Sequence, residues 1–134
     1  LARVRPVYLQ NIFKVYKQGE QILGKSRMGL LEWTRQHDVR MVGYSVINSW
    51  PHILAPLQDP HVLAIARVHG RTASQVLHRW ALQHGVAVIP KASSRDRIRE
   101  NMQLFDFELE SSEMAVLDGL ATLSESTHDS LQPA

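Results

Sequence analysis

The residues of this sequence best suited to chemistry lie between Lys91 and Arg99. Lys91 is followed by a short turn that carries the hydroxyl of Ser93, and a predicted helix then bears arginines at positions 95, 97 and 99. Backbone N–H groups at a helix N-terminus, hydroxyl groups and cationic side chains are the donors with which proteins hold phosphate. The pattern therefore indicates a phosphate-binding site.

These cations also have a plainer explanation, because lysine and arginine on a helix are usually solvated surface residues. In the whole chain, Lys plus Arg number 15 against 13 acidic residues, and the formal net charge is +2. A balance this even does not indicate a general polyanion-binding protein, so the basic character is local. The cations do not interleave with exposed aromatic residues either, and we expect no nucleic-acid binding.

A short apolar run directly before Lys91 is expected to position it. The run Val86–Ile89 is too brief for a buried helix, and Gly85 and Pro90 bound it. This profile is typical of a strand buried on both faces, as in a parallel sheet. Lys91 then lies just past the carboxyl end of the strand.

Hydrophobic patterning predicts three strands and five helices along the chain. Strands are expected over residues 7–13, 39–45 and 86–89, and helices over 26–37, 59–69, 72–84, 94–102 and 111–120. The order β-α-β-α-α-β-α-α implies an α/β fold with a parallel sheet and right-handed crossovers. Residues 1–121 form the predicted domain, and residues 122–134 form a polar C-terminal tail that we expect to be loose.

Local signals set the predicted helix ends. Ser26 is expected to cap the first helix. Asp59 followed by Pro60 is typical of a helix start, and Gly70 of a helix end. Thr72 opens the next helix with a capping box.

The composition is that of a folded protein. Hydrophobic residues make up 44% of the 134 residues and charged residues 21%, so we expect an apolar core that includes Trp33 and Trp80. The absence of cysteine excludes disulfides and thiolate metal sites, and the seven histidines lack zinc-binding spacing. No apolar run is long enough for a membrane span. The sequence leaves open whether the chain is cytoplasmic or lies in an organelle matrix.

The stretch from residue 57 to residue 120 resembles the aldo-keto reductase family. It reads LQDPHVLAIARVHGRTASQVLHRWALQHGVAVIPK from Leu57 to Lys91, and it continues with the similar segments 97–101, 105–109 and 117–120. Upstream, residues 6–10 and 43–45 resemble the sixth and seventh strands of the family's barrel.

The resemblance implies a (β/α)8 barrel that binds NADP(H) across the carboxyl ends of its strands. Such a TIM barrel needs about 250 residues and carries its site on that face. The chain is therefore expected to form a partial barrel, equivalent to the last three strands and helices.

The implied cofactor contacts come from the strand ends and from the turn and helix after the last strand: Gln10, Tyr44, Ser45, Lys91, Ser93, Arg97, Glu100 and Asn101. Gln10 would contact the nicotinamide carboxamide, Tyr44 would stack on its ring, and Ser45 would lie near the pyrophosphate. Lys91 and Arg97 would grip the 2′-phosphate of the adenosine ribose, and Glu100 and Asn101 would face the adenine.

Plainer roles stay open for two of these residues, since Tyr44 could be a packing residue and Gln10 could pair with backbone at a strand end. The chain also departs from the family pattern. Ala92 stands where a serine is usual, which removes one hydroxyl from the phosphate site, and Arg95 stands where neutral or acidic residues are common.

The family's catalytic residues are the larger departure. Its hydride chemistry needs a tyrosine acid with lysine, aspartate and histidine around it, all from earlier strands of the barrel. Nothing in residues 1–134 can be assigned to those positions, so no catalytic residue is predicted.

Two hypotheses about function follow. In the first, the chain is the C-terminal, NADP-binding half of an aldo-keto reductase-like oxidoreductase, and carbonyl reduction requires the catalytic half from elsewhere. In the second, it is a catalytically inactive relative that serves as a structural or accessory subunit of a larger assembly. In both, a partial barrel exposes strand edges, so we expect the missing half or another protein subunit to cover residues 7–10 and 86–89.

Overall fold

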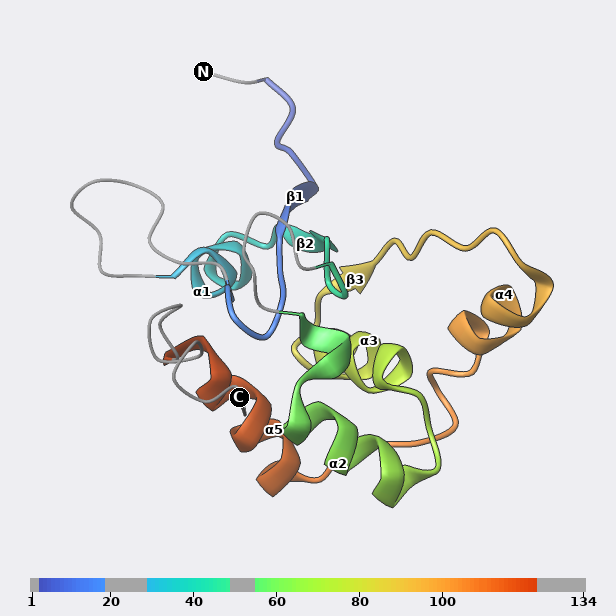
Figure 1. The fold of residues 1–134 in the computed structure, drawn as a ribbon. Coiled ribbons are helices and arrows are strands. Elements are labelled where there is room, and N and C mark those ends of the chain that lie inside the picture. Colours follow the sequence, from blue (N-terminus) through green and yellow to red (C-terminus); the bar gives the residue numbers. More distant parts are fainter. Residues whose placement is uncertain (1–2, 19–28, 49–54, 123–134) are drawn as a thin grey trace.

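A computed structural model of the chain describes residues 3–18, 29–48 and 55–122 (Figure 1). Its strands are β1 (Tyr8–Ile12), β2 (Arg40–Tyr44) and β3 (Ala87–Val88), and its α-helices are α1 (Leu30–Gln36), α2 (Pro60–His69), α3 (Ala73–Gln83), α4 (Arg95–Met102) and α5 (Ser111–Gly119). Two short 3₁₀ helices, η1 (Pro56–Gln58) and η2 (Leu120–Thr122), complete the described elements. The predicted order of strands and helices is confirmed, and the predicted tail lies, apart from Thr122, outside the described residues.

The three strands form one parallel sheet in the order β1-β2-β3. In its register, Gln10 of β1 pairs with Val42 of β2, and Val42 pairs with Ala87 of β3. Because side chains alternate along a strand, these three residues share one face of the sheet. The predicted parallel sheet is thus confirmed.

Local signals place the ends of α2 and α3 as predicted. The Asp59 carboxylate accepts a hydrogen bond of 2.9 Å from the N–H of His61 and caps α2. Gly70 ends that helix in the left-handed conformation, with φ of 59°, where glycine costs least. Thr72 and Gln75 form the predicted capping box of α3.

The start of α1 differs from the prediction. The helix begins at Leu30 with Gly29 as its N-cap residue, so the predicted cap at Ser26 is three residues too early. Ser26 itself lies outside the described residues.

The core lies between one face of the sheet and helices α2, α3 and α5. Trp80 is fully buried and stacks on Phe13, with ring centroids 4.8 Å apart and 15° between the planes. Gly43 permits this packing, because a Cβ atom there would lie 3.0 Å from Phe13 Cβ and 3.0 Å from Val86 Cγ1. The predicted core role of Trp80 is confirmed.

Trp33 is not a core residue. It is half-buried, and its ring stacks on the exposed His37 of the same helix turn, with centroids 4.2 Å apart. The apolar side of α1 is therefore covered only in part.

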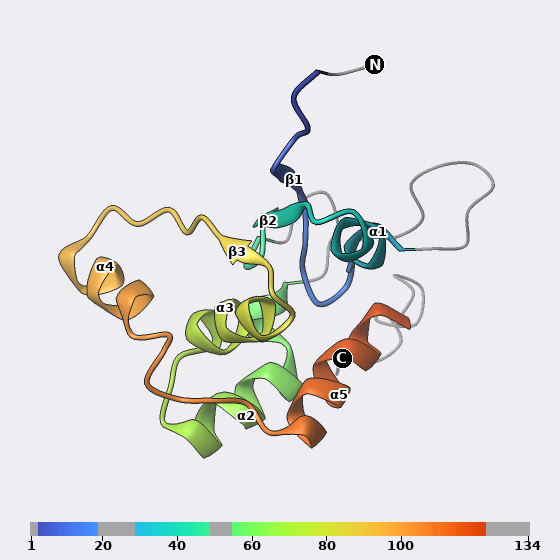
Figure 2. The same cartoon turned by 180° about the vertical axis from the view of Figure 1, so that it is seen from behind.

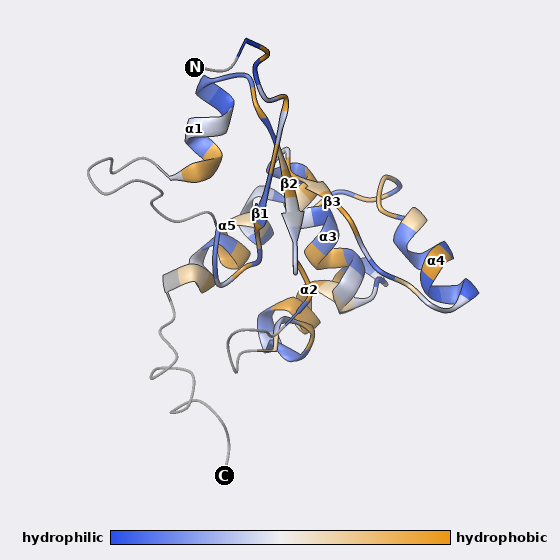
Figure 3. Ribbon diagram, turned by 90° about the horizontal axis from the view of Figure 1, so that it is seen from above, coloured by the Kyte–Doolittle hydropathy of each residue, from blue (hydrophilic) through white to orange (hydrophobic). Residues whose placement is uncertain are grey.

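The opposite face of the sheet has no helix over it within the described residues. Figure 3, seen from above, has the strands in front of α2 and α3. On this open face Tyr8 is 64% exposed and Ile89 is 54% exposed. The prediction that residues 86–89 are buried on both faces is therefore wrong, because the described chain supplies a layer only on the Val86 side.

Helix α4 stands apart from the other helices (Figures 1 and 2), and none of its residues is buried. Its C-terminal end is held by α3. The Gln75 amide donates to the backbone carbonyls of Glu100 and Gln103, at 3.2 Å each, and the Thr72 hydroxyl donates to the Glu100 carboxylate. The helix is thus fixed mainly from one end.

Candidate phosphate-binding site

A cavity of about 220 Å³ lies where the chain continues past the carboxyl ends of β2 and β3. Residues 45–48 form one wall, residues 89–91 form another, and His78 of α3 contributes between them. Two of the predicted site residues, Ser45 and Lys91, therefore line one cavity. Parallel sheets generally bind ligands at this edge.

Ser45 has an unusual backbone conformation at the mouth of this cavity. Its φ is 57°, in the left-handed region that non-glycine residues rarely occupy. Its carbonyl accepts a hydrogen bond of 3.2 Å from the N–H of Asn48, which closes a tight turn after β2. Strained residues of this kind concentrate at functional sites.

Exposed cationic and hydroxyl side chains occur in the segment that begins at the cavity wall and continues into α4. Lys91 and Ser93 are exposed, as is Arg97 in the first turn of α4. Ser94 caps that helix, since its hydroxyl oxygen accepts a hydrogen bond of 3.4 Å from the N–H of Arg97. Within the described residues neither Arg95 nor Arg97 forms an ion pair, so their positive charges are available to a ligand.

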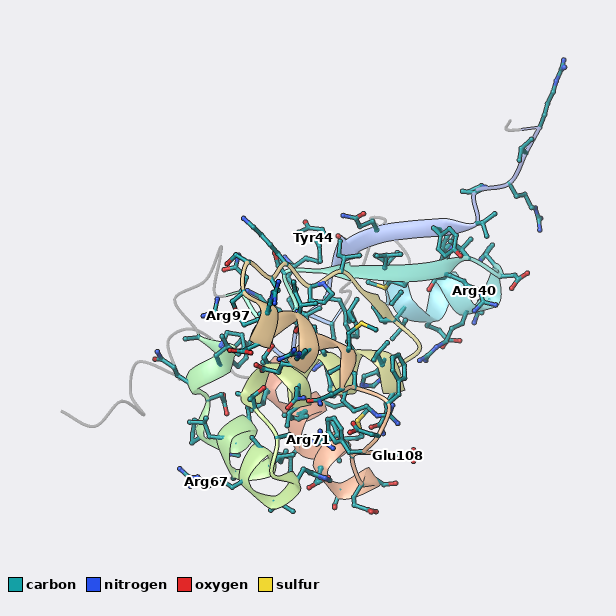
Figure 4. All side chains as sticks on the ribbon, turned by 90° about the vertical axis from the view of Figure 1, so that its right-hand side faces the viewer. Arg40, Tyr44, Arg67, Arg71, Arg97 and Glu108 are labelled. Carbon is teal, nitrogen blue, oxygen red and sulfur yellow. The ribbon has the colours of Figure 1, made fainter. Side chains whose placement is uncertain are left out.

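Gln10 and Tyr44 lie on the open face of the sheet, away from α3. Ile12 pairs with Tyr44, and Gln10 precedes Ile12 by two residues, so the alternation of the strand puts Gln10 and Tyr44 on the same face. Gln10 is exposed and Tyr44 half-buried. Figure 4 places Tyr44 toward the same end of the sheet as Arg97, with Arg40 at the opposite end.

Glu100 and Asn101 are not part of the cavity. The Glu100 carboxylate accepts the hydrogen bond from Thr72 described above. Asn101 lines a second hollow of about 480 Å³ between α3, β3 and α4, whose other walls are mostly apolar and include Leu82, Met102 and Phe105. The structure therefore groups the eight predicted residues into a cavity pair, a sheet-face pair, Ser93 in the turn before α4, and three residues along α4.

His78 is a cavity residue that the sequence analysis did not single out. Its side chain is 2% exposed, and its Nδ1 lies 3.4 Å from the Ser74 hydroxyl oxygen. Burial lowers the pKa of His78 to about 4, against the opposing effects of a Ser74 backbone hydrogen bond and the Glu100 charge. The imidazole is thus uncharged at neutral pH. The sequence does contain a signal for His78, because it is a polar residue at one of the helically spaced positions of α3 that are otherwise mostly apolar and buried.

Other kinds of site find no support in the described part of the chain. Residues 3–18, 29–48 and 55–122 contain no group of three or more metal-ligating side chains. Over the same ranges, no helix combines the length and the apolar character that crossing a bilayer requires.

Sequence comparison relates the chain to reductases. The profile of the aldo/keto reductase family matches residues 57–122. Prostaglandin F synthase 1 of Bos taurus is 40% identical over 98 residues, and dihydrodiol dehydrogenase 3 of Bos taurus is 39% identical over 98 residues. Each match covers 68% of this chain and 30% of the relative, so the chain spans about 30% of the length of these relatives.

Solved structures resemble the fold over most of the chain. An aldo/keto reductase from Brucella melitensis superposes with a TM-score of 0.73 at 27% identity, covering 87% of this chain and 40% of that one. The apo form of the protein Gox0644 gives a TM-score of 0.75 at 28% identity, covering 91% and 41%. A variant of Gox0644 in complex with NADPH gives a TM-score of 0.74 at 29% identity, covering 87% and 39%.

Proposed function

This chain belongs to the aldo/keto reductase family, and we propose that it forms the C-terminal, NADP(H)-binding part of an aldo-keto reductase-like oxidoreductase. Its three-stranded parallel sheet and five helices match part of that family's barrel, and we assign them to the last three strands. Reduction of a carbonyl group then requires the catalytic part of the barrel in addition to these 134 residues.

The cavity that joins Ser45 to Lys91 is the observation that carries this proposal. Its donor set suits a phosphate-bearing ligand, because it combines an ammonium group, a hydroxyl group and a tight turn of backbone at the strand ends. Arg97 adds a guanidinium group in the first turn of α4. A hydrogen bond between charged partners typically contributes about 1.5–3 kcal/mol.

The two strand residues suit the other end of the dinucleotide. The Gln10 amide both donates and accepts hydrogen bonds, as recognition of a carboxamide requires. Tyr44 offers an aromatic surface on the same sheet face, and planar rings stack on such surfaces. A bound NADPH would supply the hydride, and Gln10 and Tyr44 would hold and orient its nicotinamide end.

The open sheet supports the need for a covering layer. Tyr8 and Ile89 are exposed apolar residues on the face that no described helix covers. At one edge, β1 has no neighbouring strand within the described residues, and β3 forms the other edge. Unpaired strand edges recruit further strands, so we propose that the missing part of the barrel, or another protein subunit, lies on this face.

The test is a titration of the purified full chain with NADPH, followed by fluorescence energy transfer from tryptophan, with NADH as the control ligand. We expect selectivity for NADPH, and about a tenfold or greater loss of affinity in Lys91→Ala and in Arg97→Ala. Arg67→Ala is the matched control, since Arg67 is an exposed cation on α2. Equal affinity for the two nucleotides, or an unchanged affinity in both site variants, would contradict the proposal.

Carbonyl reduction is not expected from these residues alone. No side chain among them is assigned to the proton-donating role, so NADPH oxidation with a carbonyl substrate should stay at the uncatalysed rate. Turnover by the purified chain would show that the assignment of the catalytic residues is wrong.

The alternative is a catalytically inactive subunit of a larger assembly. The exposed apolar residues and strand edges favour it, because they require a partner whether or not a cofactor binds. A stable partner recovered with the chain, together with no detectable NADPH binding, would support this second function over the first.

A further inference from the structure

Among the described residues, His78 is the one buried titratable residue in the wall of the candidate cavity, and only one of its two ring nitrogens lies near a hydrogen-bond partner. Nδ1 lies against the Ser74 hydroxyl, whereas Nε2 has no hydrogen-bond partner within the described residues. No side-chain nitrogen or oxygen that is sealed from solvent lacks a partner among the described residues, so the unpaired Nε2 reaches the solvent in the cavity that His78 lines. The nitrogen is therefore accessible to a ligand in that cavity.

We propose that His78 binds a phosphate oxygen of NADP(H) through Nε2–H, as a further member of the site formed by Ser45 and Lys91. The inference rests on the proposed function, because it takes the cofactor as the ligand of this cavity. It adds a residue that comes from helix α3 rather than from a strand end or from α4.

The chemistry of the imidazole fits this role. Because its pKa is about 4, the ring is uncharged at neutral pH and carries a single N–H. An ionised phosphate oxygen only accepts hydrogen bonds, so binding requires the tautomer with the proton on Nε2. The Ser74 hydroxyl can then donate to Nδ1, which satisfies both ring nitrogens.

The neighbours of His78 on α3 are core residues, since Leu77 and Trp80 are fully buried. An apolar side chain would suit the same place. The imidazole instead presents a hydrogen-bonding nitrogen to the cavity that His78 lines.

Two measurements on the full chain test the inference. The first is the dissociation constant for NADP⁺, which we expect to rise about tenfold in His78→Leu. In His78→Gln, whose amide N–H₂ can replace Nε2–H, we expect it to stay within about twofold. His37→Leu, at the C-cap of α1, is the matched control and should bind like the wild type.

The second measurement is the ¹⁵N spectrum of the histidine rings in the wild-type chain, which requires no variant to fold. Addition of NADP⁺ should move the Nε2 resonance of His78 toward that of a protonated nitrogen and the Nδ1 resonance toward that of an unprotonated one. A ring contributing only to packing would show no such exchange of protonation between its nitrogens.

The outcomes separate the two proposals. If NADP⁺ binds and Lys91→Ala weakens it, while His78→Leu and the His78 resonances are unaffected, the inference is overturned and the proposed function stands. If the wild-type chain does not bind NADP⁺, the proposed function fails and the inference fails with it.

Discussion

The indole Nε1 of Trp80 donates a hydrogen bond of 2.8 Å to the Asp118 carboxylate, and this bond joins α3 to α5. The His84 Nε2 lies 2.7 Å from the same carboxylate oxygen. One carboxylate is therefore in hydrogen-bond contact with Trp80 of α3 and with His84 at the C-cap of that helix. Gln83 adds a backbone link, since its amide both donates to and accepts from the main chain of Leu109. The C-terminal helix is therefore held by polar bonds as well as by apolar packing.

Replacement of Asp118 by Ala should destabilise the fold by about 2–3 kcal/mol, because it leaves the indole N–H of a fully buried tryptophan without its acceptor. Urea unfolding followed by tryptophan fluorescence measures this loss. The control is Asp106→Ala, which breaks the exposed ion pair with Arg71 and should cost less than about 1 kcal/mol. Equal losses in the two variants would mean that the Trp80–Asp118 hydrogen bond contributes no more to the free energy of unfolding than the exposed Asp106–Arg71 ion pair.

A methyl group at Gly43 should destabilise the fold by about 1–3 kcal/mol through overpacking, since its Cβ would press on Phe13 and Val86. The matched control is Gly119→Ala at the end of α5, where a Cβ meets no atom within 4 Å. That change should be neutral or stabilising by up to about 1 kcal/mol. Thermal unfolding of both variants checks the contrast, and a neutral Gly43→Ala would mean that the strands can separate to admit the methyl group.

His78 should make the free energy of unfolding depend on pH in a defined window. Its pKa is about 4 in the folded chain, against about 6.5 for an unperturbed histidine. Between these values the unfolded state binds more protons, so the free energy of unfolding falls as the pH falls from 6.5 toward 4. The loss due to this one group is about 2 kcal/mol between pH 7.5 and pH 5.

Urea unfolding of the wild type and of His78→Leu at these two pH values isolates the effect. The variant should lose about 2 kcal/mol less than the wild type on acidification. The pKa of His78 is influenced by Ser74 of its own helix and by Glu100 of α4, and Lys91 lines the same cavity. These three residues are the same in the wild type and in His78→Leu. An identical pH response would contradict burial of an uncharged imidazole.

The open sheet face should make the chain associate in solution. Light scattering coupled to size exclusion should give a mass above that of a monomer, and Tyr8→Lys or Ile89→Lys should lower it, because a charge resists burial at a strand edge. Val68→Lys is the control, since Val68 is an exposed apolar residue on α2. A wild-type chain that is monodisperse and monomeric by itself would refute the proposal that this face needs a covering layer.

Helix ends were the most predictable part of the fold, because their causes are local. The cap at Asp59, the left-handed stop at Gly70 and the capping box at Thr72 each depend on residues within four positions. The start of α1 was misjudged because a serine alone does not fix a helix start; in the structure Gly29 takes that place.

The burial of individual residues was less predictable than the order of strands and helices, because burial depends on what packs against each face of a strand. The run at residues 86–89 is apolar throughout, yet Val86 is buried and Ile89 exposed. For the site, the family pattern picked out Ser45 and Lys91, which do share a cavity. His78 was missed because its importance arises from a cavity between segments that are distant in sequence.

Helix α4 buries none of its residues, and this has a thermodynamic consequence for the anion site. An eight-residue helix is too short to persist in water by its own propensity, so the helix–coil equilibrium of residues 95–102 depends on the Ser94 cap and on the anchor at Glu100. A bound phosphate at the first turn would shift that equilibrium toward helix. The affinity of the chain for its anion then includes the cost of winding this helix, and amide hydrogen exchange in α4 should slow when the ligand binds.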